Sequence, residues 1–276
     1  MAFRPLSTRD ADAVRILHVS DPHYDFHPVE IREAVLSSIE RADFDVVACT
    51  GDIANSENNC AEFLGWFSDV KAPKFLTPGN HDLWWIRKPA TAERHAGERN
   101  ADGFWGHAAR AGWLTPNPDK LWDVVQNVLM FNVFYTPNPA WDHIPPSRYS
   151  RGRGGNDPMY SADCRQMFGF RDLFKDPGSP GKESLPSVAW SMGHLSPSDM
   201  IPSFFPPQVC FVNNRIGELA KAHGSLLHLF GHTHEARDVE VGRLRCVNHS
   251  WVDAQYDVNL PREGLVVRSA VRRLDS

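Results

Sequence analysis

Side chains that bind metals or transfer protons recur in this sequence directly after short apolar runs. The middle example is the stretch 77–82, where a Pro-Gly pair ends an apolar run and Asn80, His81 and Asp82 follow. Tight turns at strand ends hold loop residues in fixed positions at the edge of a sheet. Repetition of this arrangement is hard to explain by packing alone, so it points to a chemical site.

Four further stretches have the same construction. The polar residues that follow their apolar runs are Asp21 and His23, then Asp52, then His194, and finally His232 and His234. The two residues of the first pair, Asp21 and His23, and of the last pair, His232 and His234, are two positions apart. On extended backbone, side chains at this spacing point the same way. Mixed imidazole and carboxylate ligands suit Mn, Fe, Ni and Zn. Two ions about 3.5 to 4 Å apart need a shared ligand and several others each. With Asn80, the seven candidates are enough for a binuclear site.

The elements that must position these residues are predicted from periodicity and turn signals. In the first third we expect strands at 14–20, 45–49 and 73–77, and a helix at 29–41. A second helix carries Phe63 and Leu64, and we expect Asn58 or Asn59 to cap it. This alternation of strands and helices predicts βαβ units and a parallel sheet.

The rest of the chain has a looser middle and an ordered end. We expect short helices near 90–98 and 103–112, a strand at 128–135 and a helix at 161–175. The expected closing elements are strands at 187–192, 225–230, 238–247 (with a hairpin at Gly242) and 264–272, and a helix at 208–222. No repeat or independent linker is visible. We therefore predict one domain, 1–276, with a long insert at about 83–186 that covers the active site.

Composition narrows the class of protein. The chain has 276 residues, 42% of them hydrophobic, which is enough for a sizeable core. Its net charge of −5 counts against a dedicated nucleic-acid binder. No apolar run reaches membrane-spanning length and no signal peptide is visible. Five dispersed cysteines favour reduced thiols and a cytoplasmic location. The sequence does not indicate an oligomeric state.

Taken in order, the motifs resemble those of the calcineurin-like metallophosphoesterase superfamily. They are Asp21-x-His23, Gly51-Asp52, Gly79-Asn-His-Asp82, the lone His194 and Gly231-His-x-His234. Each motif is weak alone, but their order after apolar strands makes the resemblance specific. It implies an α/β fold, a four-layer αββα sandwich of two mixed sheets, with a metal site at the C-terminal ends of the strands. The resemblance does not extend to the insert.

The resemblance also implies a ligand set and an activity. One divalent ion is expected to take Asp21, His23, Asp52 and His234, and the other Asp52, Asn80, His194 and His232, so that Asp52 bridges them. The expected reaction is attack of a metal-bridging hydroxide on a small-molecule phosphate ester. His81 is expected to protonate or hydrogen-bond the leaving oxygen, and Asp82 to orient or charge the His81 imidazole.

Local departures from the family's patterns favour phosphodiesters. The segment Gly51-Asp-Ile-Ala-Asn55 lacks the tyrosine of purple acid phosphatases and the Asp-Arg-Gly run of protein Ser/Thr phosphatases. The chain is therefore more similar to bacterial small-molecule phosphodiesterases. A phosphomonoesterase remains an alternative, because monoesterases also carry a histidine at the position of His81.

Two alternatives come from other classes. A catalytically silent scaffold would bind a partner through the insert. A nuclease would need a local basic surface, for which the sequence offers Arg148, Arg151 and Arg153 and the segment 262–273. Trp84 or Trp85 could line a substrate pocket, whereas His18, His223 and His228 are interpreted as structural. His249 could lie near the site, although a structural role fits its position as well.

Overall fold

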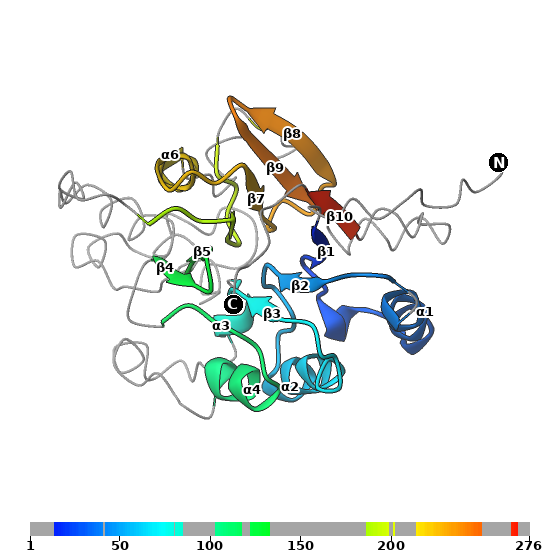
Figure 1. The fold of residues 1–276 in the computed structure, drawn as a ribbon. Helices are drawn as coiled ribbons and strands as arrows, with labels where there is room; N and C mark the ends of the chain where they lie inside the picture. The colour runs from blue at the N-terminus through cyan, green and yellow to red at the C-terminus, as the bar shows by residue number, and fades with distance from the viewer. Residues whose placement is uncertain are drawn as a thin grey trace, which may run out of the picture.

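Two sheets packed face to face organise the protein. The computed structural model describes residues 14–40, 42–79, 81–84, 103–117, 122–132, 186–198, 201, 214–249 and 266–269. The strands form a four-stranded sheet of order β10-β1-β2-β3 and a six-stranded sheet of order β4-β5-β6-β7-β9-β8. Helices α1, α2 and α4 lie beside the first sheet and α6 lies beside the second (Figure 1). This arrangement confirms the predicted αββα sandwich.

The first sheet contains the predicted βαβ units. Its parallel strands are β1 (Val14–Val19), β2 (Val46–Cys49) and β3 (Lys74–Leu76), connected through α1 (Val29–Glu40) and α2 (Glu57–Gly65). Strand β10 (Val266–Ser269) pairs antiparallel with β1. The prediction that Asn58 or Asn59 caps α2 is wrong. Ser56 is the N-cap, because its backbone is extended and its hydroxyl accepts the N–H of Asn59.

The second sheet is mixed. Its strands are β4 (Trp122–Val125), β5 (Val128–Phe131), β6 (Trp190–Met192), β7 (Leu227–Leu229), β8 (Arg237–Val241) and β9 (Leu244–Asn248). Strands β5, β6, β7 and β9 run parallel, and β4 and β8 are antiparallel edges. The hairpin at Gly242 is confirmed. Strand β4 was not predicted, since its turn uses Gln126 and Asn127 at positive φ instead of glycine.

Alternating side chains along the strands contribute to two hydrophobic cores, one between the sheets and one under the helices. On β1, Ile16 packs between the sheets with Trp190 and Phe75, whereas Leu17 and Val19 pack toward the helices. The outer face of the first sheet is covered by α2 and by α4 (Phe104–Arg110). The outer face of the second sheet is covered by α6 (Asn214–Ala222). Both sheets are therefore rigid platforms for the loops at their ends.

Part of the predicted insert belongs to the sandwich. Residues 104–131 supply α4, β4 and β5, and β5 pairs with β6 inside the second sheet. The ranges 85–102 and 133–185 lie outside the described residues, as do the predicted helices at 90–98 and 161–175 and the first residues of the helix at 208–222. The single-domain organisation and the covering role of the insert therefore stay predictions. Among the described helices, none is long and apolar enough to cross a bilayer.

Candidate metal centre

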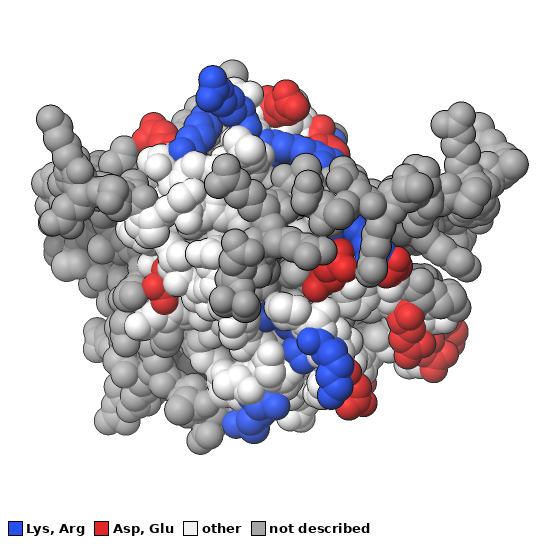
Figure 2. All heavy atoms as spheres, in the orientation of Figure 1, with Lys and Arg blue, Asp and Glu red and all other residues white. Residues whose placement is uncertain are grey.

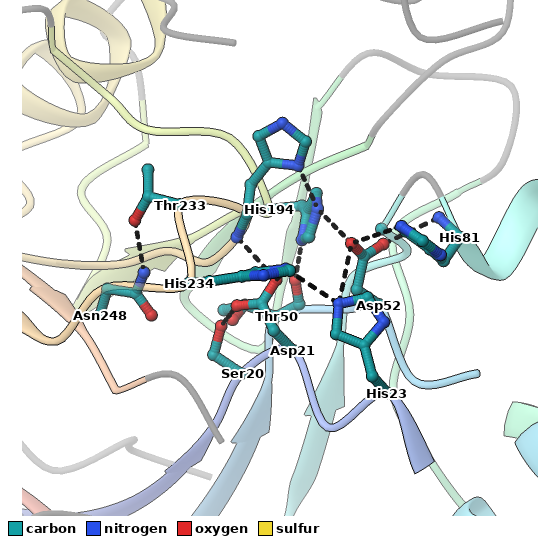
Figure 3. Close-up of polar contacts among 12 residues, drawn as sticks. Ser20, Asp21, His23, Thr50, Asp52, His81, His194, Thr233, His234 and Asn248 are labelled. Atoms are coloured by element: carbon teal, nitrogen blue, oxygen red, sulfur yellow. Dashed lines mark hydrogen bonds and ion pairs between the residues drawn. The ribbon is translucent and has the colours of Figure 1, made fainter. Parts of the chain in front are cut away.

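The predicted site residues meet where the strands of both sheets end. Asp21 and His23 follow β1, and Asp52 follows β2. His194 follows β6, and His232 and His234 follow β7. Loops of both sheets therefore contribute residues to the site. Figure 3 shows Asp21, Asp52, His23, His194 and His234 pointing toward one another. The structure thus brings together six of the seven predicted ligands, and Asn80 lies outside the described residues.

One group of four residues could hold a metal ion. Asp21, His23, Asp52 and His234 each offer a ligand atom, and these atoms lie within 4.8 Å of one another. The Nε2 atoms of His23 and His234 are 2.9 Å apart. His234 Nε2 is 3.6 Å from Asp21 Oδ1, and His23 Nε2 is 3.8 Å from Asp52 Oδ2.

A second group shares Asp52 with the first. Asp52, His194 and His232 also offer ligand atoms within 4.8 Å of one another. His194 Nε2 lies 3.0 Å from Nδ1 of His232 and 3.3 Å from Oδ2 of Asp52. Asp52 therefore stands between two clusters, at the place that a bridging carboxylate needs.

The donor set fits divalent cations. Burial lowers the pKa of His23 to about 3 and holds the pKa of His232 well below its ordinary value, so both imidazoles are neutral. A neutral imidazole presents one lone pair, and metal ligands must be deprotonated. In each cluster two imidazole nitrogens lie about 3 Å apart with carboxylate oxygens beside them, so several electron-pair donors surround one position. A cation would satisfy these lone pairs.

The contacts of His194 show which of its nitrogens is available to a metal ion. Its Nδ1 lies 2.7 Å from the carbonyl oxygen of Thr50, which can only accept, so Nδ1–H donates and Nε2 faces the cluster. Burial opposes protonation of this imidazole, but the nearby carboxylates of Asp52 and Asp21 outweigh it and raise the pKa of His194 to about 9. A bound cation would take the place of that proton.

The two ligand carboxylates differ in their electrostatics. Burial alone would raise the pKa of Asp52, but the imidazoles of His194 and His81 outweigh it and hold that pKa well below its ordinary value. Burial raises the pKa of Asp21, although its Oδ1 accepts the backbone N–H of His232 at 2.8 Å. That hydrogen bond joins the loop after β1 to the loop after β7.

Five of the six described ligands have left-handed backbone conformations. The φ angles are positive at Asp21 (49°), His23 (36°), Asp52 (55°), His232 (70°) and His234 (54°). Such residues without glycine's freedom cost about 1 to 3 kcal/mol each and cluster at functional sites. The clustering of these five conformations is typical of a functional site.

Two glycines let the loops approach each other. A Cβ on Gly79 would lie 2.1 Å from Oδ1 of Asp52. A Cβ on Gly231 would lie 2.5 Å from Oγ of Ser20 and 2.8 Å from Oδ2 of Asp21. The glycines of the Gly-Asn-His-Asp and Gly-His-x-His motifs therefore have a steric reason.

Asp82 supports the loop that carries Asp52. Its Oδ2 accepts the N–H groups of Asp52 and Gly79, both at 2.8 Å, and its Oδ1 accepts that of Ile53 at 2.7 Å. We expected Asp82 to orient the imidazole of His81, but Nδ1 of His81 instead lies against Oδ1 of Asn55. These contacts make Asp82 a positioning residue for Asp52.

His81 stands beside the clusters on their more open side. Its backbone N–H donates to Oδ1 of Asp52 at 2.8 Å, and its Nε2 lies 3.9 Å from Oδ2 of Asp52. Its side chain is 16% exposed, compared with 1% for Asp52. Asn55, its partner, was not predicted. The loop of Asn55 is held in turn by Asp25, which accepts its N–H at 2.9 Å.

Other sequence-based expectations have different outcomes. Thr50 and Asn248 were missed as supporting residues; Asn248 is buried, and its Nδ2 donates to Oγ1 of Thr233 at 2.9 Å. The ring of His249 lies 6.0 Å from that of His18, and His249 belongs to neither described cluster. Trp85 and the arginines at 148, 151 and 153 lie outside the described residues.

Solved structures with similar folds come from several organisms. A phosphopantetheinyl hydrolase from Mycobacterium tuberculosis aligns with a TM-score of 0.56 and 14% identity, over 95% of this chain and 97% of that chain. A Thermus thermophilus protein aligns at 0.46 and 14% identity, over 86% and 89%. A protein of unknown function from Aquifex aeolicus aligns at 0.40 and 12% identity, over 88% and 92%. At 14% identity the likeness to the first of these structures concerns the fold alone, and no curated protein matches the sequence.

The sequence also matches a protein-family model over most of its length. The model described as calcineurin-like phosphoesterase matches residues 14–236, which include both ligand clusters and the strands that position them. The predicted resemblance is thereby confirmed. The chain belongs to the calcineurin-like phosphoesterase family, whose members are metal-dependent hydrolases.

Proposed function

We propose that this protein is a binuclear metal-dependent phosphoesterase that acts on small-molecule phosphate esters, with diesters favoured. The observation that carries the proposal is the position of Asp52 in both ligand clusters. In this proposal Asp21, His23, Asp52 and His234 hold one ion, and Asp52, Asn80, His194 and His232 hold the other. The mixed ligands suit manganese, iron, zinc or nickel.

The residues of the chain have separate tasks in the proposed reaction. When bound, two such ions lower the pKa of a bridging water and neutralise charge on the phosphoryl oxygens. The hydrogen bonds from the N–H groups of Asp52, Ile53 and Gly79 to Asp82 keep the Asp52 carboxylate in place.

His81 is the proposed proton donor to the leaving oxygen. Oδ1 of Asn55 lies against its Nδ1, and an amide oxygen accepts, so Nδ1 carries a proton. Burial lowers the pKa of His81, although Asp52 opposes this shift, so the doubly protonated imidazole is the minor form and a stronger acid than an exposed histidine. Its second proton is on Nε2, on the side of Asp52. From there Nε2–H can be donated to an alkoxide or phenoxide leaving group.

The preference for diesters rests on the motif around Asp52, which lacks the features of two phosphatase classes. A phosphomonoesterase is the alternative, since His81 serves either reaction. A silent scaffold is less well supported, because the six described ligands are all in place. For a nuclease, the face drawn in Figure 2 shows acidic and basic side chains interspersed among the described residues. We also propose a cytoplasmic location, to which the free, buried Cys49, Cys60 and Cys246 conform.

The test is hydrolysis of bis-p-nitrophenyl phosphate and p-nitrophenyl phosphate by protein stripped with a chelator and reloaded with manganese. Turnover is expected only after reloading, and faster for the diester. Asp52→Asn should lower kcat/KM by at least about a hundredfold, since even residues behind metal ligands typically contribute 10- to 100-fold. Asp69→Asn is the matched control, because Asp69 is an exposed acid after α2.

The outcomes separate the candidates. Faster hydrolysis of the monoester would replace the diesterase by the phosphomonoesterase. Full activity of Asp52→Asn would contradict the binuclear mechanism. Protein that binds no metal after any loading and hydrolyses neither ester would favour the scaffold.

A further inference from the structure

An aromatic side chain is exposed directly beside the candidate metal centre. Phe26 is 63% exposed, whereas Tyr24, two residues before it, and His27, directly after it, are only 2% and 3% exposed. It ends the short 3-10 helix Tyr24–Phe26 that follows the ligand His23. Single exposed apolar residues are common on proteins, so exposure alone says little. The position of this ring is what matters.

The turn that presents Phe26 is firmly held. The hydroxyl of Tyr24 donates to Glu62, and the Tyr24 ring packs edge-on against Trp66, with centroids 4.7 Å apart. The guanidinium of Arg32 lies 4.2 Å from the centroid of the same ring. The backbone N–H of Phe26 donates to the carbonyl of His23 at 2.8 Å. Phe26 is therefore presented outward from an anchored backbone.

Phe26 lies next to the open side of the site. Its ring centroid is 5.7 Å from that of His23, and the His23 ring is 4.6 Å from His81 and 4.7 Å from His234. His234 and His81 have side-chain exposures of 36% and 16%, whereas that of His194 is 0%. Solvent therefore reaches the clusters at His81 and His234, as well as at the half-buried His232, and the first two imidazoles lie one ring away from Phe26.

We propose that Phe26 contacts the organic group of the substrate and makes the protein prefer phosphate esters whose organic group is aromatic or otherwise apolar. This inference rests on the proposed phosphoesterase function and adds a substrate class to it. An apolar group placed against Phe26 removes apolar surface of both partners from water, and two aromatic rings gain further from offset or edge-on contact. A strongly hydrated organic group gains neither.

A structural role for the same ring makes a different prediction. If Phe26 only supported His23, its removal would weaken metal binding, and every ligand of the site would be affected alike. If it contacts the organic group, its removal affects ligands according to that group and leaves the metal content unchanged. A pair of ligands that differ only in the organic group therefore distinguishes the two roles.

The experiment measures binding of phenylphosphonate and methylphosphonate to the manganese-loaded protein by calorimetry, with metal content determined on the same samples. These probes cannot be hydrolysed, so the result does not depend on turnover. The native protein is expected to bind phenylphosphonate about tenfold more tightly, the lower end of what small apolar differences produce in a pocket. Phe26→Ala should remove this preference with affinity for methylphosphonate and metal content unchanged, and Phe26→Leu should keep part of it.

Leu226→Ala is the matched control, because Leu226 is 61% exposed but precedes β7, at the opposite end of that strand from His232. This variant should keep the native preference. The inference is overturned by equal affinities of the native protein for the two probes, by binding of neither, or by a loss in Phe26→Ala that is equal for both. Preferential binding of phenylphosphonate without hydrolysis of any ester would support Phe26 as the contact while refuting the proposed function.

Discussion

Buried ionisable residues do different work in this protein according to what faces them. Asp52 faces imidazoles that stabilise its charge, whereas Asp82 faces three backbone N–H groups. Burial and the neighbouring Asp52 raise the pKa of Asp82 to about 7, although those N–H groups oppose the shift. His228 lies on β7 outside both clusters, and its Nδ1 is 2.9 Å from Oγ of Ser191.

His228 leads to a prediction about pH. Burial lowers its pKa to about 3 in the folded protein, whereas an unfolded histidine titrates near 6.5. Its contribution to stability is therefore complete above about pH 6.5 and is lost as the pH falls toward 3, by about 1.4 kcal/mol per pH unit. Between pH 7 and pH 5, the free energy of unfolding should fall by about 2 kcal/mol more in the native protein than in His228→Gln.

Urea denaturation of both proteins at pH 7, 6 and 5, in chelator, measures this difference. The chelator keeps competition between metal and protons out of the comparison. Parallel pH dependences of the two proteins would show that His228 is protonated in the folded state or that its environment adapts.

At the scale of elements, strand β3 is joined to the end of α2 by a buried lysine. Lys74 is 5% exposed, and its Nζ donates to the carbonyl of Phe67 at 2.7 Å and to that of Val70 at 3.4 Å. These carbonyls belong to the turn after α2, in which the carbonyl of Phe67 also accepts the N–H of Val70 at 3.1 Å. This contact was not predicted, because a lysine in a strand usually faces water.

We expect Lys74→Met to lower the free energy of unfolding by about 1 to 3 kcal/mol, because methionine keeps the apolar stem but removes the ammonium donor from both carbonyls. The carbonyl of Phe67 would then keep only the backbone N–H of Val70. Lys71→Met is the matched control, since Lys71 is exposed three residues earlier and surface changes usually stay within about 0.5 kcal/mol. Chemical denaturation of the three proteins tests this. Equal stability of native protein and Lys74→Met would mean that water replaces the ammonium group at no cost.

At the scale of the whole molecule, the candidate metal centre connects the two sheets. The loops after β1 and β2 supply Asp21, His23 and Asp52, and the loops after β6 and β7 supply His194, His232 and His234. Ions held by both sets would join the two halves of the sandwich, in addition to the apolar core between the sheets.

Metal loading is therefore expected to stabilise the folded chain. Manganese at a hundred times its Kd for one site should add about 2.7 kcal/mol, which corresponds to roughly 5 to 10 °C in Tm for a chain of this size. Differential scanning calorimetry of the chelator-treated protein, with and without manganese, measures the shift. Asp52→Asn should lose most of it and Asp69→Asn should keep it. An equal shift in both variants would indicate binding elsewhere on the protein.

Much of the site could be predicted because its signal is local. A strand followed by a turn and a polar ligand is contained in about nine consecutive residues, as in 74–82 or 226–234. Parallel strands bring such turns to one edge, so the meeting of Asp21 and Asp52 follows from order and pattern. His234 follows a strand of the other sheet, so it joins them only once the two sheets have packed. Strand β4 and the Ser56 cap were missed because turns and caps depend on backbone conformations that several residues can adopt.

The sequence by itself determined the family, the sandwich and the residues that could bind metal, since motif order and strand periodicity are properties of the chain. Only the tertiary structure decided which side chains support them. Asp82 accepts backbone N–H groups of the Asp52 loop, and Asn55 contacts His81. Phe26 is exposed beside His23. Such contacts join segments far apart in sequence or depend on the path of a turn, so their geometry exists only after the two sheets have packed.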